Sequence, residues 1–143
     1  MKSINIYLNF PGNTEEAFNF YKSIFNTEFS ALMRFSDTPE AEKLSDEEKN
    51  KIMHSALPLN ENISIMATDA LESMGQKLEY GNNSYIILST DTKEEADRLF
   101  NSLAQDVTPE MPMQDTFWGA YFGSLKDKYG VQWMLNYDYP KSN

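Results

Sequence analysis

The residue types that most often carry chemistry are scarce in this chain. Its 143 residues include one histidine, His54, and no cysteine. The lack of cysteine excludes disulfides, thiolate metal sites and a cysteine nucleophile. A Ser-His-Asp arrangement could be built only around His54, and a site needing two or three imidazoles is impossible within one chain. Chemistry at a histidine is therefore restricted to one position.

Two pairs of adjacent glutamates are a second candidate for chemistry. They lie in the segments NTEEAFNFYKSIF (13–25) and TKEEADRLFNSLA (92–104), which align without a gap. Each segment has apolar residues at helical spacing, namely 17, 20, 21, 24 and 25 in the first and 96, 99, 100, 103 and 104 in the second. Asn13 and Thr92 stand at N-cap positions, each followed three residues later by a glutamate. Carboxylates in a first helical turn complement the helix dipole, so we interpret the pairs as helix-start residues rather than as a catalytic carboxylate pair.

Strand patterns surround both predicted helices. Residues 4–10, INIYLNF, alternate between an apolar face and a face formed by Asn5, Tyr7 and Asn9. The other predicted strands cover residues 29–35, 53–59, 62–69, 84–90, 117–123 and 131–137, with an irregular stretch containing Pro109 and Pro112 before the last two. Each half then reads as a strand, a helix and up to three strands. This repeat predicts an α+β fold of two β-α-β-β-β modules, about 1–70 and 84–139, joined by a linker at 71–83.

The composition limits the kinds of partner that we expect for this chain. The net charge is −10, which opposes binding to nucleic-acid phosphates. No apolar run reaches the length of a membrane span, and no signal-peptide pattern opens the chain. We therefore expect a cytoplasmic protein with neither nucleic acid nor membrane as a partner. Residues 36–51 are charged, and we expect a loop there with a short exposed helix that is capped by Ser45 and Glu48.

Three stretches resemble the vicinal oxygen chelate superfamily, which includes glyoxalase I, extradiol dioxygenases and bleomycin resistance proteins. They are YLNFPGNTEEAFNFY (7–21), MHSALPL (53–59) and DTFWGAYFGSLKDKYGVQWMLN (115–136), and together they run nearly end to end. The closer match is to the PhnB-like branch, often labelled demethylubiquinone methyltransferase-like. The resemblance implies a single domain in which each module forms a curved, half-barrel mixed sheet with its helix outside and a cavity inside.

The implied cavity predicts which side chains of each strand could contact a ligand. Asn5, Tyr7 and Asn9 are expected to face the cavity. His54 and Ala56 face it if Ser55 and Leu57 pack outward. His54 is then either a histidine hydrogen-bonded to the backbone or a neighbouring strand, or a ligand contact or general base.

Aromatic residues are expected to line part of the same cavity. Trp118 and Tyr121 are predicted on opposite faces of one strand, so one of them faces the cavity and which one stays open. Aromatic side chains there would suit a flat, partly apolar ligand. Met111, Met113 and the neighbouring prolines are read as a lip, either a lid or a loop.

The superfamily's metal ligands do not stand at the corresponding positions. Metal-dependent members hold a divalent ion with His and Glu side chains from four cavity strands. The four positions carry Asn5 or Tyr7, Ser64 or Met66, Ser84 or Tyr85, and Met134, the last counted from Gly130. Amide, phenol, hydroxyl and thioether groups bind Zn²⁺, Mn²⁺ or Fe²⁺ poorly. We therefore expect no metal and no other cofactor.

The ligand candidates are residues of the implied cavity, and no catalytic residue is assigned. They are Asn5, Tyr7, Asn9, His54, Ala56, Trp118, Tyr121 and Met134. The chain is interpreted as a PhnB-like protein that binds a small organic ligand and forms a homodimer. Methyl transfer is not expected, because no G-x-G loop of a Rossmann cofactor site occurs. Two alternatives remain: a metal-dependent isomerase, lyase or dioxygenase, and a drug-sequestering resistance protein of the bleomycin-binding type.

Overall fold

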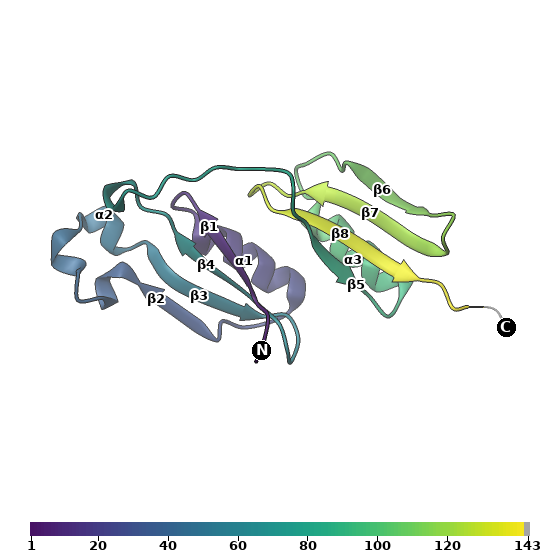
Figure 1. Ribbon diagram of the computed structural model, residues 1–143, viewed down its shortest axis with the longest axis horizontal. Coiled ribbons are helices and arrows are strands. Elements are labelled where there is room, and N and C mark those ends of the chain that lie inside the picture. Colours follow the sequence, from purple (N-terminus) through teal and green to yellow (C-terminus); the bar gives the residue numbers. More distant parts are fainter. Residues whose placement is uncertain (142–143) are drawn as a thin grey trace. The chain divides into compact units, whose positions relative to one another are not determined.

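The chain folds into two compact units, Met1–Glu79 and Tyr80–Asn143, which we describe one at a time. The computed structural model describes residues 1–141. Each unit contains one four-stranded sheet and one long helix that covers one face of that sheet (Figure 1). Among the described residues, no helix is long and apolar enough to span a bilayer.

The first unit has the strand order β1-β4-β3-β2. Strand β1 runs parallel to β4, whereas β3 is antiparallel to both β4 and β2. A charged segment between β2 and β3 contains the short helix α2. The elements are β1 (Ile6–Phe10), α1 (Thr14–Phe25), β2 (Ala31–Arg34), α2 (Asp46–Lys49), β3 (Ile52–Pro58) and β4 (Ser64–Asp69).

The second unit has the matching order β5-β8-β7-β6, again with its first and last strands parallel. Its elements are β5 (Ile86–Ser89), α3 (Lys93–Leu103), β6 (Met111–Asp115), β7 (Ala120–Lys126) and β8 (Gln132–Asp138). Each unit therefore reads strand, helix and three strands. The predicted α+β fold of two β-α-β-β-β modules is confirmed.

Strand β6 was missed by the sequence reading, which treated Met111 and Met113 as part of an irregular lip. Met111–Asp115 pairs antiparallel with β7, and its register shifts between Met111 and Gln114. Pro112 lacks the N–H of an interior ladder, so it is tolerated only because β6 is an edge strand. Strand β7 also begins at Ala120 rather than at 117, because residues 117–119 form the turn from β6 and Gly119 adopts a φ of 90°.

The buried side of helix α1 differs slightly from the predicted one. Ala17, Phe18, Tyr21 and Ile24 are buried, whereas Phe20 and Phe25 are partly exposed. Phe18 is fully buried because its ring meets Phe10 of β1 edge to face, with 6.2 Å between the ring centroids. In α3 the predicted residues Ala96, Leu99, Phe100 and Leu103 are buried as expected.

The start of α1 differs from the expected capping box. Asn13 occupies the N-cap position but its side chain makes no capping hydrogen bond. Asp69, at the end of β4, accepts a hydrogen bond from the Thr14 N–H at 3.0 Å and another from the Ile52 N–H at 2.8 Å. This buried carboxylate therefore joins the starts of α1 and β3 to the end of β4, and it supplies the negative charge that a helix start prefers.

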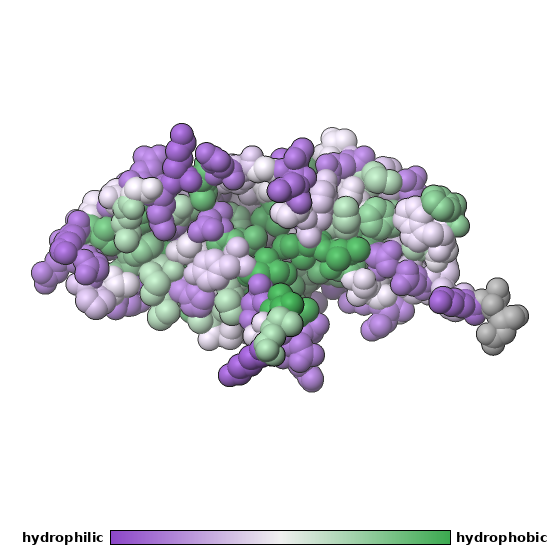
Figure 2. Space-filling model, viewed as in Figure 1, coloured by the Kyte–Doolittle hydropathy of each residue, from purple (hydrophilic) through white to green (hydrophobic). Residues whose placement is uncertain are grey.

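The other two predicted caps are present. Thr92 accepts a hydrogen bond from the Glu95 N–H at 3.1 Å, and Ser45 with Glu48 forms a complete capping box at α2. The loop before α2 lies at the left-hand end of the view, where hydrophilic side chains stand out (Figure 2). The charged segment is thus a solvated connection, as the sequence indicated.

Replacing Asp69 by alanine should lower the free energy of unfolding by about 3 kcal/mol, because two N–H groups near the core lose their charged acceptor. Urea denaturation of both proteins measures the loss. Replacing Glu61, which is exposed, by glutamine is the control and should change stability by less than about 0.5 kcal/mol. Equal stability of Asp69→Ala and the parent protein would contradict the role given to Asp69.

Candidate functional site

In each sheet one face meets the helix and the other is free of it. We call the free face of the first unit its open face. The alternation of burial along β1 and β4 and the strand pairing assign the residues. The open face carries Tyr7, Asn9, Ala31, Met33, His54, Ala56, Met66 and Thr68. Four predicted ligand candidates, Tyr7, Asn9, His54 and Ala56, lie on this one face.

The structure brings Tyr7 and His54 together. The Tyr7 hydroxyl lies 3.0 Å from His54 Nδ1, and the two rings stack with 5.7 Å between centroids and an interplanar angle of 22°. Strand β4 separates β1 from β3, so the tyrosine side chain crosses β4 to reach the imidazole. Burial raises the pKa of Tyr7, which keeps the phenol neutral at neutral pH. The sequence placed both residues in the implied cavity but gave no sign that they are partners.

Asn5 and Ala56 have structural roles in the first sheet. Asn5 lies before β1, where its side-chain oxygen accepts a hydrogen bond from the Ser64 N–H at 3.0 Å. Ala56 is 4% exposed and faces Ala31 and Met66 across the two neighbouring ladders. Asn9 remains exposed. The open face therefore offers a ligand two polar features, the Tyr7–His54 pair and the amide of Asn9.

The open face of the second unit is defined in the same way. Its residues alternate with those that pack under α3, and they include Ile87, Phe122, Ser124, Met134 and Asn136. Ile87 is 55% exposed and Met134 is partly exposed. Met134 thus stands on the open face, at the position that the sequence analysis compared with a metal-binding glutamate.

Trp118 and Tyr121 do not share a strand. Trp118 lies in the turn between β6 and β7, is 58% exposed, and meets the ring of Phe122 with 6.3 Å between centroids. Tyr121 lies in β7 on the side that faces α3, and its hydroxyl donates a 2.6 Å hydrogen bond to Asp97. Trp118 is therefore the one beside the open face, through Phe122, while Tyr121 is a packing residue.

The hydroxyl of Tyr121 belongs to a polar cluster under α3. The Lys93 ammonium stands 4.4 Å from the centre of the Tyr121 ring, and Tyr139 hydrogen-bonds to Asp115 nearby. The hydrogen bond to Asp97, followed by burial, raises the pKa of Tyr121 to about 12. These interactions attach the start of α3 to β7 and to the segment after β8, so they serve the fold.

Two edge strands of the second unit are linked by a hydrogen bond that the sequence did not suggest. Tyr85, the residue before β5, donates to both carboxylate oxygens of Glu110, the residue before β6, at 2.8 and 3.0 Å. Strands β5 and β6 are the opposite edges of this sheet. Because the partners are 25 residues apart, no local pattern marks them.

The family-like motif DKYGV around Asp127 is structural. The buried Asp127 carboxylate accepts hydrogen bonds from the Tyr129 and Val131 N–H groups and from the Trp133 indole N–H at 2.8, 3.0 and 2.8 Å. Gly130 has a φ of 89°, a conformation that side chains with a Cβ rarely adopt. The motif therefore holds the β7–β8 turn and the fully buried Trp133 in place.

A polar hollow of about 440 Å³ lies near the start of α1, away from the open face. Its two cationic groups are already paired: Arg34 contacts Glu15, and Lys51 donates to the Gly12 carbonyl at 2.9 Å. The bond to Glu15 raises the pKa of Arg34. These contacts tie the start of α1 and the turn before it to the end of β2 and to the residue before β3.

The donors on the open faces do not suit a divalent metal. At the four compared positions the structure offers the phenols of Tyr7 and Tyr85 and the thioethers of Met66 and Met134. Within residues 1–141, no three His, Asp or Glu side chains come close enough to hold an ion. Carboxylate and imidazole ligands of the kind that Zn²⁺, Mn²⁺ and Fe²⁺ require are therefore not assembled.

The paired modules define a class of protein. A glyoxalase/bleomycin resistance protein/dioxygenase family enzyme from Burkholderia phytofirmans has the same fold, with a TM-score of 0.62 at 17% identity over 96% of this chain and 98% of that one. This likeness shows a shared fold of two modules, each with one open sheet face.

Within that class, the family model for 3-demethylubiquinone-9 3-methyltransferase matches residues 2–136. The chain belongs to this family, the PhnB-like branch of the superfamily. Protein YjdN from Escherichia coli is 31% identical over 136 residues, which cover 91% of each chain. The predicted family is confirmed.

Two solved structures are also similar to this chain. Protein PA1353 from Pseudomonas aeruginosa has a TM-score of 0.84 at 38% identity, over 95% of this chain and 97% of that one. A putative 3-demethylubiquinone-9 3-methyltransferase, PhnB protein, from Bacillus cereus has a TM-score of 0.75 at 30% identity, over 94% and 98%. These likenesses extend over nearly the whole of each chain.

Stability should fall as the pH rises from 10 to 12, partly through Tyr121. Its pKa is about 12 in the folded protein and about 10 when unfolded, so its contribution is complete below pH 10 and disappears toward pH 12. Tyr121→Phe should flatten this part of the curve, measured by urea denaturation at several pH values. Tyr80→Phe, at an exposed ring, is the matched control. An unchanged slope in Tyr121→Phe would contradict the assignment.

Proposed function

We propose that this chain binds a small organic molecule on the open faces of its sheets and does so without a divalent metal. The observation that carries the proposal is the hydrogen bond between Tyr7 and His54 on a face that no helix covers. A phenol and an imidazole in contact offer a donor and an acceptor to a ligand. Neither group is used to hold a helix or a turn.

Apolar side chains around the polar groups support the same conclusion. Tyr7 is 49% exposed and Met33 is 40% exposed on the first open face. Ile87 and Trp118 are more than half exposed on or beside the second. Large apolar groups that stay in contact with water are typical of ligand-binding surfaces. The mixture favours a flat, partly apolar ligand with at least one polar group.

Methyl transfer, which the family description names, has little support in the local structure. Gly12 is the one glycine in the turn between β1 and α1, where a dinucleotide-type cofactor site would have several. Divalent-metal chemistry lacks a matching ligand set. Binding is therefore the function that the residues favour, and a reaction at the same face would have to use the Tyr7–His54 pair.

The test begins with the ligand that co-purifies with the protein, identified by native mass spectrometry and denaturing extraction. Calorimetric titration then compares its affinity for the parent protein, Tyr7→Phe and His54→Leu. We expect each variant to bind about tenfold more weakly, because each loses one hydrogen-bonding group worth about 1.4 kcal/mol at the ligand.

Tyr121→Phe is the matched control, since it removes a phenol on the helix side of β7. It should leave the affinity unchanged. Equal loss in all three variants would indicate general destabilisation and contradict a site at Tyr7 and His54. A stoichiometric divalent ion in the purified protein would contradict binding without such a metal.

We also propose that the protein is a cytoplasmic homodimer, as the sequence analysis expected. The exposed edges of its two four-stranded sheets favour pairing with a second copy. Sedimentation equilibrium should give twice the chain mass of 16.5 kDa. A monomer mass at micromolar concentration would contradict the dimer.

A further inference from the structure

Two methionines flank the imidazole on the open face of the first unit. Met33 is the direct cross-strand partner of His54 in the β2–β3 ladder. Met66, on β4, is paired with Ala56, so it is the diagonal neighbour of His54 on the same face. Direct partners have Cβ atoms about 5 Å apart and diagonal ones about 7 Å, within reach of two long, flexible thioethers.

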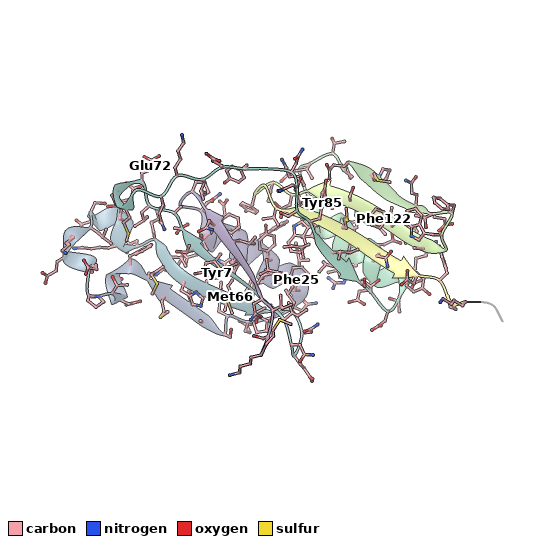
Figure 3. The ribbon with its side chains drawn as sticks, viewed as in Figure 1. Tyr7, Phe25, Met66, Glu72, Tyr85 and Phe122 are labelled. Atoms are coloured by element: carbon pink, nitrogen blue, oxygen red, sulfur yellow. The ribbon has the colours of Figure 1, made fainter. Side chains whose placement is uncertain are left out.

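Tyr7 fixes which side of the imidazole remains available. Its hydroxyl lies 3.0 Å from Nδ1, so that nitrogen is occupied and Nε2 is left for another partner. Tyr7 is also the parallel partner of Met66, so the phenol crosses β4 beside this thioether (Figure 3). A histidine that binds a metal commonly donates its second ring N–H to an oxygen, and the phenol oxygen is in that position.

The remaining donors on this face select the kind of metal. None of the open-face residues carries a carboxylate, so the face offers no hard anionic ligand. Two thioethers and one neutral imidazole form a soft, uncharged donor set, which suits Cu(I) and disfavours Zn²⁺ and Mn²⁺. Met33 is 40% exposed and Met66 and His54 are partly exposed, so an ion can reach all three.

We propose that Met33, His54 and Met66 form a binding site for Cu(I), with Tyr7 as the group that orients the imidazole. The metal would be held by the two sulfur atoms and by Nε2. This site is distinct from the superfamily's divalent site in both ligands and metal. It rests on the strand register and the Tyr7–His54 contact, and it does not depend on the proposed organic ligand.

The experiment is an anaerobic titration of the full chain with Cu(I) against bicinchoninic acid, a coloured Cu(I) chelator. One equivalent should be withdrawn from the chelator by the parent protein. His54→Ala and the double variant M33L/M66L should withdraw none. Tyr7→Phe should retain the site but bind about tenfold to a hundredfold more weakly, as expected for loss of an outer partner.

The matched control is M111L/M113L. This variant also removes two of the chain's eight methionines, but they lie in β6 of the second unit. It should bind like the parent protein. Methyl NMR spectra of the methionines with Ag(I), a redox-inert soft ion, give a second measurement: the signals of Met33 and Met66 should shift at one equivalent. Thermal melting of each variant verifies that it is folded.

Three results would overturn the proposal: equal binding by M33L/M66L and M111L/M113L, equal shifts of all methionine signals, or no binding by the folded parent protein. Weaker binding of both the organic ligand and Cu(I) by folded Tyr7→Phe would support both proposals. Unchanged Cu(I) binding by this variant would contradict the role given to Tyr7 at the metal. If the protein bound one equivalent of Cu(I) but no organic ligand, the proposed function would be wrong and the copper site would stand.

Discussion

The packing of one sheet face against one helix constrains every other feature of each unit. Side chains alternate along a strand, so burying one set under the helix leaves the next set on the opposite face. Phe10 and Ile65 lie under α1, and their neighbours Asn9 and Met66 must then lie on the open face. A shift of register by one residue would bury the phenol of Tyr7 and expose the core. The register that stabilises the core therefore also presents the donors available to a ligand.

Two buried carboxylates maintain that register at the ends of strands. Asp69 ties the end of β4 to the starts of α1 and β3, and Asp127 holds the turn that leads into β8. Both accept N–H groups that would otherwise be buried without partners, which is costly in a protein interior. Neither carboxylate reaches the open face. The acidic residues with the best-defined geometry in this chain are thus structural, and the open face of the first unit is left with neutral donors.

Much of the fold could be predicted from the sequence because its signals are local. Helical spacing and the Thr92 cap located α3, and period-two alternation grouped Tyr7 with Asn5 and Asn9. The position of Met134 was counted from Gly130 in the register that the resemblance implies. Non-local contacts were beyond this reasoning. Asn13 has the residue type of a cap, but Asp69 arrives from 55 residues away and takes the Thr14 N–H instead. Pro112 suggested a loop, because only the observed sheet order reveals that β6 is an edge that tolerates proline.

In the candidate site, too, local patterns were predictable and non-local contacts were not. Alternation placed Tyr7 and His54 on one face, but their contact, with 5.7 Å between ring centroids, depends on a tyrosine that crosses an intervening strand. Met33 entered no prediction, because its role depends on its pairing with His54 across the β2–β3 ladder. The donors on the open face of the first unit are neutral, partly soft and set beside apolar side chains. The interactions that they offer are therefore hydrogen bonding and polarizability rather than charge.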